Sequence, residues 1–80
     1  MTTMEKIYDI IRKLNKKDIA HVPLKPETQF VDDLGLDSLD IAELLVMIED
    51  SFSIEVPMED AKKLATIAMS AEYVDRRLAG

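Results

Sequence analysis

The stretch that decides the fold is Asp32-Asp33-Leu34-Gly35-Leu36-Asp37-Ser38-Leu39-Asp40, because it ends where a long segment of helical periodicity begins. Gly35 interrupts the preceding chain, and Asp37 is of a residue type that caps helices. Downstream, apolar residues recur at three- and four-residue steps, namely Ile41, Leu44, Leu45, Ile48 and Phe52. The pattern predicts a helix over 38–51 with Ser38 at its start and this apolar stripe in the core.

Ser38 occupies a position with two possible uses. The first backbone N–H groups of a helix lack partners within the helix and lie at the positive end of its dipole. A phosphate joined to Ser38 would therefore be favourably placed. Serine is equally an ordinary helix-capping residue, so these residues alone leave a structural role open.

Three further helical segments are expected. Thr2 and Glu5 fit a capping box, and apolar residues follow at three- and four-residue steps, namely Met4, Ile7, Tyr8, Ile11 and Leu14. Together these features predict a first helix over 2–15. Pro57 suits a first helical turn and introduces a short segment over 58–62. A last helix is expected to begin near Thr66, with Tyr73 beside its apolar stripe and the tyrosine hydroxyl in water. That stripe consists of Ile67, Ala71, Val74 and Leu78.

The chain before Asp37 contains Pro23, Pro26 and Gly35 and shows no sustained period, so we expect a long loop between the first two helices. Its apolar residues are expected to pin it to the core; they are Val22, Leu24, Phe30, Val31 and Leu34. The expected fold class is all-α, a small four-helix bundle with three longer helices and one short helix.

Composition limits both the architecture and the range of partners. Eighty residues suffice for one core, so a single domain over 1–80 is expected, as a monomer. No apolar run is long enough to span a bilayer and no secretion signal begins the chain, which favours a cytoplasmic protein. The net charge of −6 argues against nucleic acid as a partner.

The sequence offers no catalytic constellation. Cysteine is absent, so the chain supplies neither a disulfide nor a thiol nucleophile. No glycine-rich phosphate loop, catalytic triad pattern or metal-ligand spacing is present, and the acids around Ser38 lack the pattern of a calcium-binding loop. His21, the single histidine, is expected to be a surface or packing residue. We therefore expect a protein that is not an enzyme and holds no metal.

Taken together, the motif residues resemble the acyl carrier protein family, across roughly the whole chain and most strongly over 30–74. The residues that carry this resemblance are Asp33-Leu34-Gly35, Asp37-Ser38-Leu39-Asp40, Glu43-Leu44, Phe52 and Ile54-Glu55-Val56-Pro57. In that family the serine of the Asp-Ser-Leu motif carries a 4′-phosphopantetheine arm. The resemblance implies that a phosphopantetheinyl transferase joins this arm, from coenzyme A, to Ser38, and that its thiol holds acyl groups as thioesters.

The resemblance also implies a docking surface on the helix that follows Ser38. Its apolar contacts would be Leu39, Ala42, Val46 and Met47, and its acidic contacts Asp37, Asp40, Glu43, Glu49 and Asp50. The partners implied are the transferase and acyl-transfer and chain-elongation enzymes that present Lys- and Arg-rich patches. The short third segment of the family lies near the acyl chain, which makes Ile54, Val56, Met58, Ala61 and Leu64 candidates for lining a pocket. Plain core packing is the alternative for each of these five.

Several alternatives stay open at this level. The chain is less acidic than the commonest carriers of fatty acid synthesis, has a proline-bearing loop at Pro23 to Pro26 and carries the basic pair Arg76-Arg77 near its end, so a related lipid or polyketide pathway fits as well. Peptidyl and aminoacyl carriers share a similar serine motif, although the acidity around Ser38 favours acyl cargo. An unmodified helical interaction domain, in which Ser38 only caps a helix, is the competing hypothesis from a different class.

Overall fold

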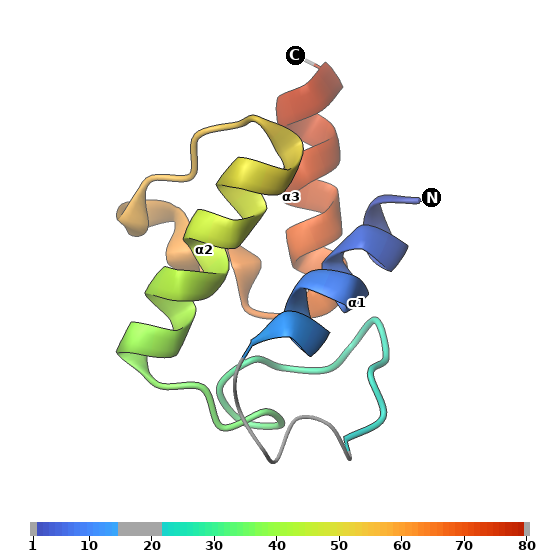
Figure 1. Cartoon of the computed structure of the whole chain (residues 1–80), viewed down its shortest axis with the longest axis vertical. Coiled ribbons are helices and arrows are strands. Elements are labelled where there is room, and N and C mark those ends of the chain that lie inside the picture. The colour runs from blue at the N-terminus through green and yellow to red at the C-terminus, as the bar shows by residue number, and fades with distance from the viewer. Residues whose placement is uncertain (1, 15–21, 80) are drawn as a thin grey trace.

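The computed structural model describes residues 2–14 and 22–79, and within them the chain is helical or irregular, with one isolated bridge between Gln29 and Thr66. The elements are α1 (Thr3–Lys13), α2 (Ser38–Phe52), the 3₁₀ helix η2 (Met58–Leu64) and α3 (Ile67–Ala79). Figure 1 shows α2 on the left, α3 at the centre and α1 on the right. The expected all-helical class is confirmed, whereas the expectations for Asn15 and His21 lie outside the described residues.

Helix starts follow the predicted capping chemistry. Thr2 is the N-cap of α1: its Oγ1 accepts from the backbone N of Glu5 at 3.1 Å, and Glu5 Oε1 accepts from the backbone N of Thr2 at 3.1 Å. The latter bond lowers the pKa of Glu5. Thr66 Oγ1 likewise accepts from the backbone N of Met69 at 3.1 Å, which confirms the predicted start of α3. The short third segment runs to Leu64, two residues further than predicted.

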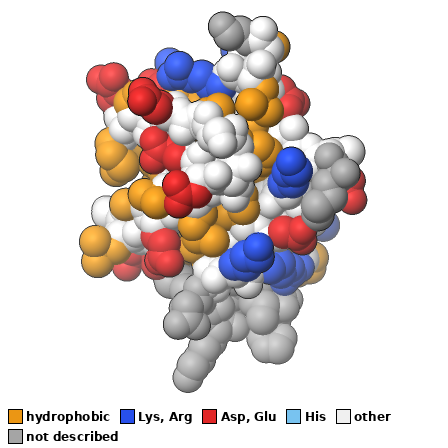
Figure 2. Space-filling view, turned by 45° about the horizontal axis from the view of Figure 1, so that its top comes forward, with side chains coloured by type: hydrophobic (Ala, Val, Ile, Leu, Met, Phe, Trp, Pro, Cys, Tyr) orange, Lys and Arg blue, Asp and Glu red, His pale blue; other side chains and the backbone are white. Residues whose placement is uncertain are grey.

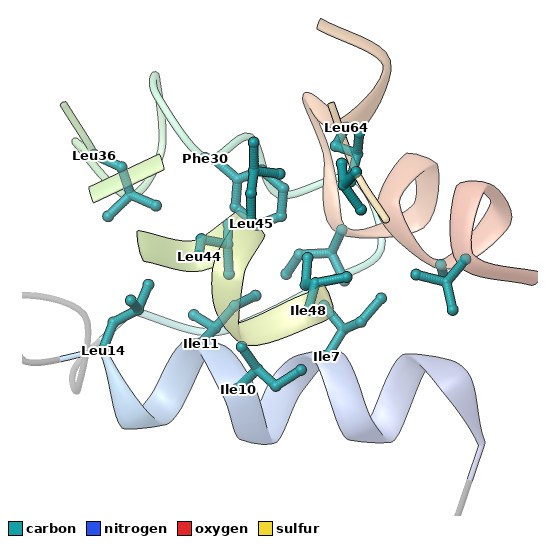
Figure 3. Close-up of a cluster of buried hydrophobic side chains, with 14 of the residues drawn as sticks. Ile7, Ile10, Ile11, Leu14, Phe30, Leu36, Leu44, Leu45, Ile48 and Leu64 are labelled. Carbon is teal, nitrogen blue, oxygen red and sulfur yellow. The ribbon is translucent and has the colours of Figure 1, made fainter. Parts of the chain in front are cut away.

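The core lies between the helices and the loop over 22–37 (Figure 3). Inward-facing residues come from α1 and its C-cap, from α2, η2 and α3, and from the loop; those labelled in the figure are Ile7, Ile10, Ile11, Leu14, Leu44, Leu45, Ile48, Phe30, Leu36 and Leu64. The predicted stripe of α2 is buried except at Ile41, which is half-buried. α1 packs against both α2 and α3, and η2 packs against α2 and α3.

Two expected core residues are exposed. Leu78 is 56% exposed because it lies in the last turn of α3, which projects beyond α1 and α2 in Figure 1. Val31 is 61% exposed, since its neighbour Phe30 turns into the core and the next side chain of an irregular segment then points outward. The two predictions were wrong for different reasons: the apolar period of α3 continues past the surface that covers the helix, whereas the loop has no period that would tell which of its side chains turn inward.

The loop is fastened to the start of α3 by backbone hydrogen bonds. Phe30 N donates to Ala65 O at 3.1 Å, and Ile67 N donates to Thr28 O at 3.1 Å. A tight reversal then follows at Gly35, whose φ of +67° is a conformation that glycine adopts without strain. This reversal leads directly into Asp37 and so fixes where α2 begins.

Ser70 is a fully buried hydroxyl in α3 for which no hydrogen-bond partner exists within the described part of the chain. An unsatisfied buried polar group costs free energy, and alanine is the better helix former. We expect Ser70→Ala to raise the free energy of unfolding by about 1 kcal/mol, and the melting temperature by roughly 4–8 °C. Thermal and urea denaturation of the parent and the variant check this, and a lower midpoint for the variant would contradict it.

Candidate functional site

Ser38 is the first residue of α2, and its neighbour Asp37 caps the helix. Asp40 N donates to Asp37 Oδ1 at 2.9 Å, and Asp37 N donates to Asp40 Oδ2 at 3.1 Å, which completes a reciprocal capping box. The side chain of Ser38 is exposed. The structure therefore gives the capping role to Asp37, and the helix start does not depend on the Ser38 hydroxyl.

An open apolar hollow of about 440 Å³ lies beside Ser38. A second hollow of about 250 Å³ adjoins it, because Val31, Ile41 and Ala61 line both. We call the two together the Ser38 trough. Its remaining lining residues are Leu36, Asp37, Ser38 and Met58 in the first hollow, and Gln29, Lys62, Leu64 and Ala65 in the second. A mostly apolar surface thus begins at the Ser38 side chain.

The five predicted pocket residues separate into two groups. Met58, Ala61 and Leu64 line the Ser38 trough. Ile54 and Val56 are absent from both linings, since Val56 is buried in the core and Ile54 packs against the core. Sequence reasoning missed Val31, Leu36 and Ile41; only Ile41, one helical turn beyond Ser38, carried a signal that could have found it.

The exposed face of α2 combines apolar and acidic side chains. Leu39 is 80% exposed and Val46 is 53% exposed, with Glu43 and Asp50 also at the surface. In Figure 2, acidic and hydrophobic side chains alternate on the left of the view, the side on which α2 lies in Figure 1. This face can meet a partner that is apolar at its centre and basic at its rim.

The other predicted docking residues are half-buried or are engaged in holding the ends of α2. Ala42 and Met47 are half-buried, and Met47 packs against the core. Asp37 and Asp40 bind each other's backbone in the capping box. Glu49 is half-buried, and its Oε2 accepts from the backbone N of Val56 at 2.9 Å. The Glu49 carboxylate therefore holds the turn after α2.

Two kinds of feature are absent from residues 2–14 and 22–79. These residues contain no group of His, Asp or Glu side chains placed to hold a metal ion. No helix formed by them is long and apolar enough to cross a membrane.

Comparison with known proteins agrees with this geometry. The family model described as "Phosphopantetheine attachment site" matches residues 5–74. The acyl carrier protein of Chlorobium phaeobacteroides is 41% identical over 91% of this chain and 91% of its own length. The chain belongs to the acyl carrier protein family. Acyl carrier proteins of Chlorobium phaeovibrioides and Chlorobium luteolum are each 40% identical over the same shares of both chains.

Acyl carrier proteins are non-catalytic carriers, and their cargo is held on a covalent 4′-phosphopantetheine group. The residues present here fit such a group. Ser38 offers an exposed hydroxyl at the N-terminal end of a 15-residue helix, where the dipole favours a phosphodiester. The Ser38 trough offers an apolar surface beside it for what the group carries. Since the chain contains no cysteine, the thiol that forms thioesters belongs to the bound group.

Proposed function

We propose that Ser38 is the residue to which 4′-phosphopantetheine is attached. A phosphopantetheinyl transferase would form a phosphodiester between Ser38 Oγ and the pantetheine phosphate of coenzyme A, whose nucleotide portion leaves. The observation that carries this proposal is that Asp37 and Ser38 have separate roles at the start of α2. Asp37 makes the capping bonds, so the Ser38 side chain is not needed to cap the helix. It is exposed and lies beside the apolar trough.

We propose further that the cargo is an acyl chain and that it lies in the Ser38 trough. Each methylene group removed from water contributes about 0.8 kcal/mol, so even a few buried methylenes would favour the shielded position. Met58, Ala61 and Leu64 would form one wall, facing Val31 and Ile41. An aminoacyl or peptidyl group, with its polar amine or amides, gains less from such a lining. The apolar trough therefore supports acyl cargo over the peptidyl alternative.

The docking surface we propose is the exposed face of α2, centred on Leu39 and Val46 and rimmed by Glu43 and Asp50. The transferase and the acyl-transfer and chain-elongation enzymes would meet it with Lys- and Arg-rich patches. Such pairing accelerates encounter and leaves dissociation fast, which suits a shuttle that changes partners. We also propose that the chain acts as one monomeric four-helix-bundle domain over 1–80, in the cytoplasm, in fatty acid or related lipid or polyketide synthesis.

Intact mass and peptide mapping test the attachment. The protein is incubated with coenzyme A and a broad-specificity phosphopantetheinyl transferase, and its mass is expected to rise by one phosphopantetheine group. Proteolysis and fragmentation are expected to place the added mass on Ser38. Mapping to another serine would refute the site, and no mass gain at all would favour an unmodified interaction domain.

A further inference from the structure

η2 forms one wall of the Ser38 trough and is the least regular helix of the described chain. It is a seven-residue 3₁₀ helix, and its N-cap, Pro57, makes no side-chain capping bond. Hydrogen bonds of 3₁₀ geometry are poorer than those of an α-helix, and short elements of this kind open more readily than the surrounding structure. The contacts between η2 and its neighbours therefore determine how stable this wall of the trough is.

The period of η2 separates its residues onto different edges. Side chains three apart eclipse one another in a 3₁₀ helix. Met58, Ala61 and Leu64 accordingly share the edge that lines the trough. Asp60 and Lys63 share another edge, and Asp60 on that edge bonds to α3.

The Asp60 carboxylate is the point of attachment between η2 and α3. Its side chain is only 16% exposed. Tyr73 OH donates to Asp60 Oδ2 at 2.6 Å, and Arg77 Nη2 lies 3.4 Å from the same oxygen. We call Asp60, Tyr73 and Arg77 the Asp60 latch.

Arg77 also fixes the tyrosine that makes this bond. Its Nη2 donates to Tyr73 OH at 2.9 Å, and its guanidinium lies over the Tyr73 ring, 5.2 Å from the ring centroid. Lys63 Nζ, at 3.5 Å from Asp60 Oδ1, adds a second cation on the η2 side. The Tyr73 hydroxyl was expected to lie in water. It instead accepts a hydrogen bond from Arg77 of α3 and donates one to Asp60 of η2.

At neutral pH both partners are in the protonation states that this bond needs. The hydrogen bond from Tyr73 lowers the pKa of Asp60, and the nearby Lys63 and Arg77 lower it further. Burial, followed by the bond to Asp60, raises the pKa of Tyr73. Because the pKa of Asp60 is lowered on folding, its contribution is complete above the ordinary aspartate pKa and disappears as the pH falls through the lowered value.

We propose that Asp60, Tyr73 and Arg77 are positioning residues that hold η2 against α3, and so set how readily an acyl chain enters and leaves the Ser38 trough. The inference rests on the proposed function, in which the trough holds the chain. No latch residue lines the trough itself. They act through Met58, Ala61 and Leu64, the residues on the other edge of η2.

Amide hydrogen exchange of the unacylated protein at neutral pH tests the hold on η2. Tyr73→Phe removes only the hydroxyl, and it is expected to speed exchange of the η2 amides roughly three- to tenfold while α1 exchange stays at the parent rate. Asp60→Asn is expected to do the same. Parent-like η2 exchange in both variants, or equal acceleration in every helix, would overturn the proposal.

Two control variants match these changes. Tyr8→Phe removes a hydroxyl from the half-buried tyrosine of α1. Glu72→Gln removes a carboxylate that pairs with Arg76. Both residues of that pair belong to α3, so the pair does not involve η2. Both controls are expected to leave η2 exchange unchanged. Acceleration by either one would mean that any loss of a polar contact loosens η2, which would overturn the specific role of the latch.

Cleavage of an acyl thioester by hydroxylamine then tests the effect on cargo. With an eight-carbon acyl group loaded, the Tyr73→Phe thioester is expected to be cleaved roughly three- to tenfold faster than that of the parent. If η2 exchange rises but cleavage does not, the latch holds η2 without governing the cargo, and the proposal fails. If the parent thioester is cleaved as fast as acyl-coenzyme A, the trough does not shelter the chain; the proposed cargo site then fails with it, and the exchange data still decide whether the latch holds η2.

Discussion

Ser38→Ala is expected to gain no mass when it is incubated with coenzyme A and a phosphopantetheinyl transferase, under conditions in which the parent gains one phosphopantetheine group. The methyl group of alanine has no oxygen with which to form the phosphodiester. Another serine is not expected to substitute, because Ser51, at the other end of α2, lies about 20 Å along the helix axis. Intact-mass spectrometry of both proteins measures the outcome.

The same variant separates the carrier from the interaction-domain hypothesis through its stability. Because Asp37 caps α2, Ser38→Ala is expected to change the free energy of unfolding by less than about 0.5 kcal/mol, whereas Asp37→Ala is expected to cost about 1 kcal/mol. Ser51→Ala, an exposed serine of the same helix, is the matched control and should load like the parent. Any loading of Ser38→Ala would show that the attachment residue lies elsewhere.

The parts of the fold that sequence predicted well are those governed by local rules. A capping box involves residues three apart, so Thr2 and Glu5 sufficed to predict the start of α1. The apolar period after Ser38 identified α2 to within one residue of its end at Phe52. In these helices the capping residues and the apolar period of the buried face indicate the same element, and either of the two would have predicted a helix there.

The lining of the trough could not be predicted in the same way. Val31 and Leu36 come from an irregular loop whose path is fixed by contacts with the link between η2 and α3, such as the bond between Phe30 N and Ala65 O. No periodicity indicates which side chain of such a loop turns inward. Val31 was expected to pin the loop to the core because it is apolar, and it lines the surface hollow beside Ser38 instead.

The roles of two acidic residues also depended on tertiary structure. Glu49 shares the acidic character of the docking residues, yet its carboxylate accepts the Val56 N–H across the turn that follows α2. Asp60 stands in the first turn of the short helix η2, and its principal partner is Tyr73, thirteen residues along the chain. The charge of Asp60 and its position in the sequence indicate which kinds of group it can bind. The packing of η2 on α3 determines that its partner is Tyr73.

Leu39→Ala is expected to lower kcat/KM for loading of Ser38 by about thirtyfold, while the free energy of unfolding changes by less than about 0.5 kcal/mol. Leu39 is 80% exposed and directly follows Ser38, so it contributes little to the core and stands where a transferase must approach. Truncating a central apolar contact of an interface costs about 2 kcal/mol or more, which corresponds to that loss of rate. Initial rates of loading at several protein concentrations, together with urea denaturation, measure both quantities.

Leu78→Ala is the matched control, because it deletes the same atoms from an exposed leucine of α3, outside the proposed docking face. We expect it to load at the parent rate. Glu43 and Asp50 rim the docking face, so the loading rate of the parent should also fall as salt screens these acids. If Leu78→Ala slows loading as much as Leu39→Ala does, the transferase does not recognise α2 in particular. Selective loss with Leu39→Ala would instead place the docking surface beside the residue that is modified, so that one helix both recruits the enzyme and presents the serine to it.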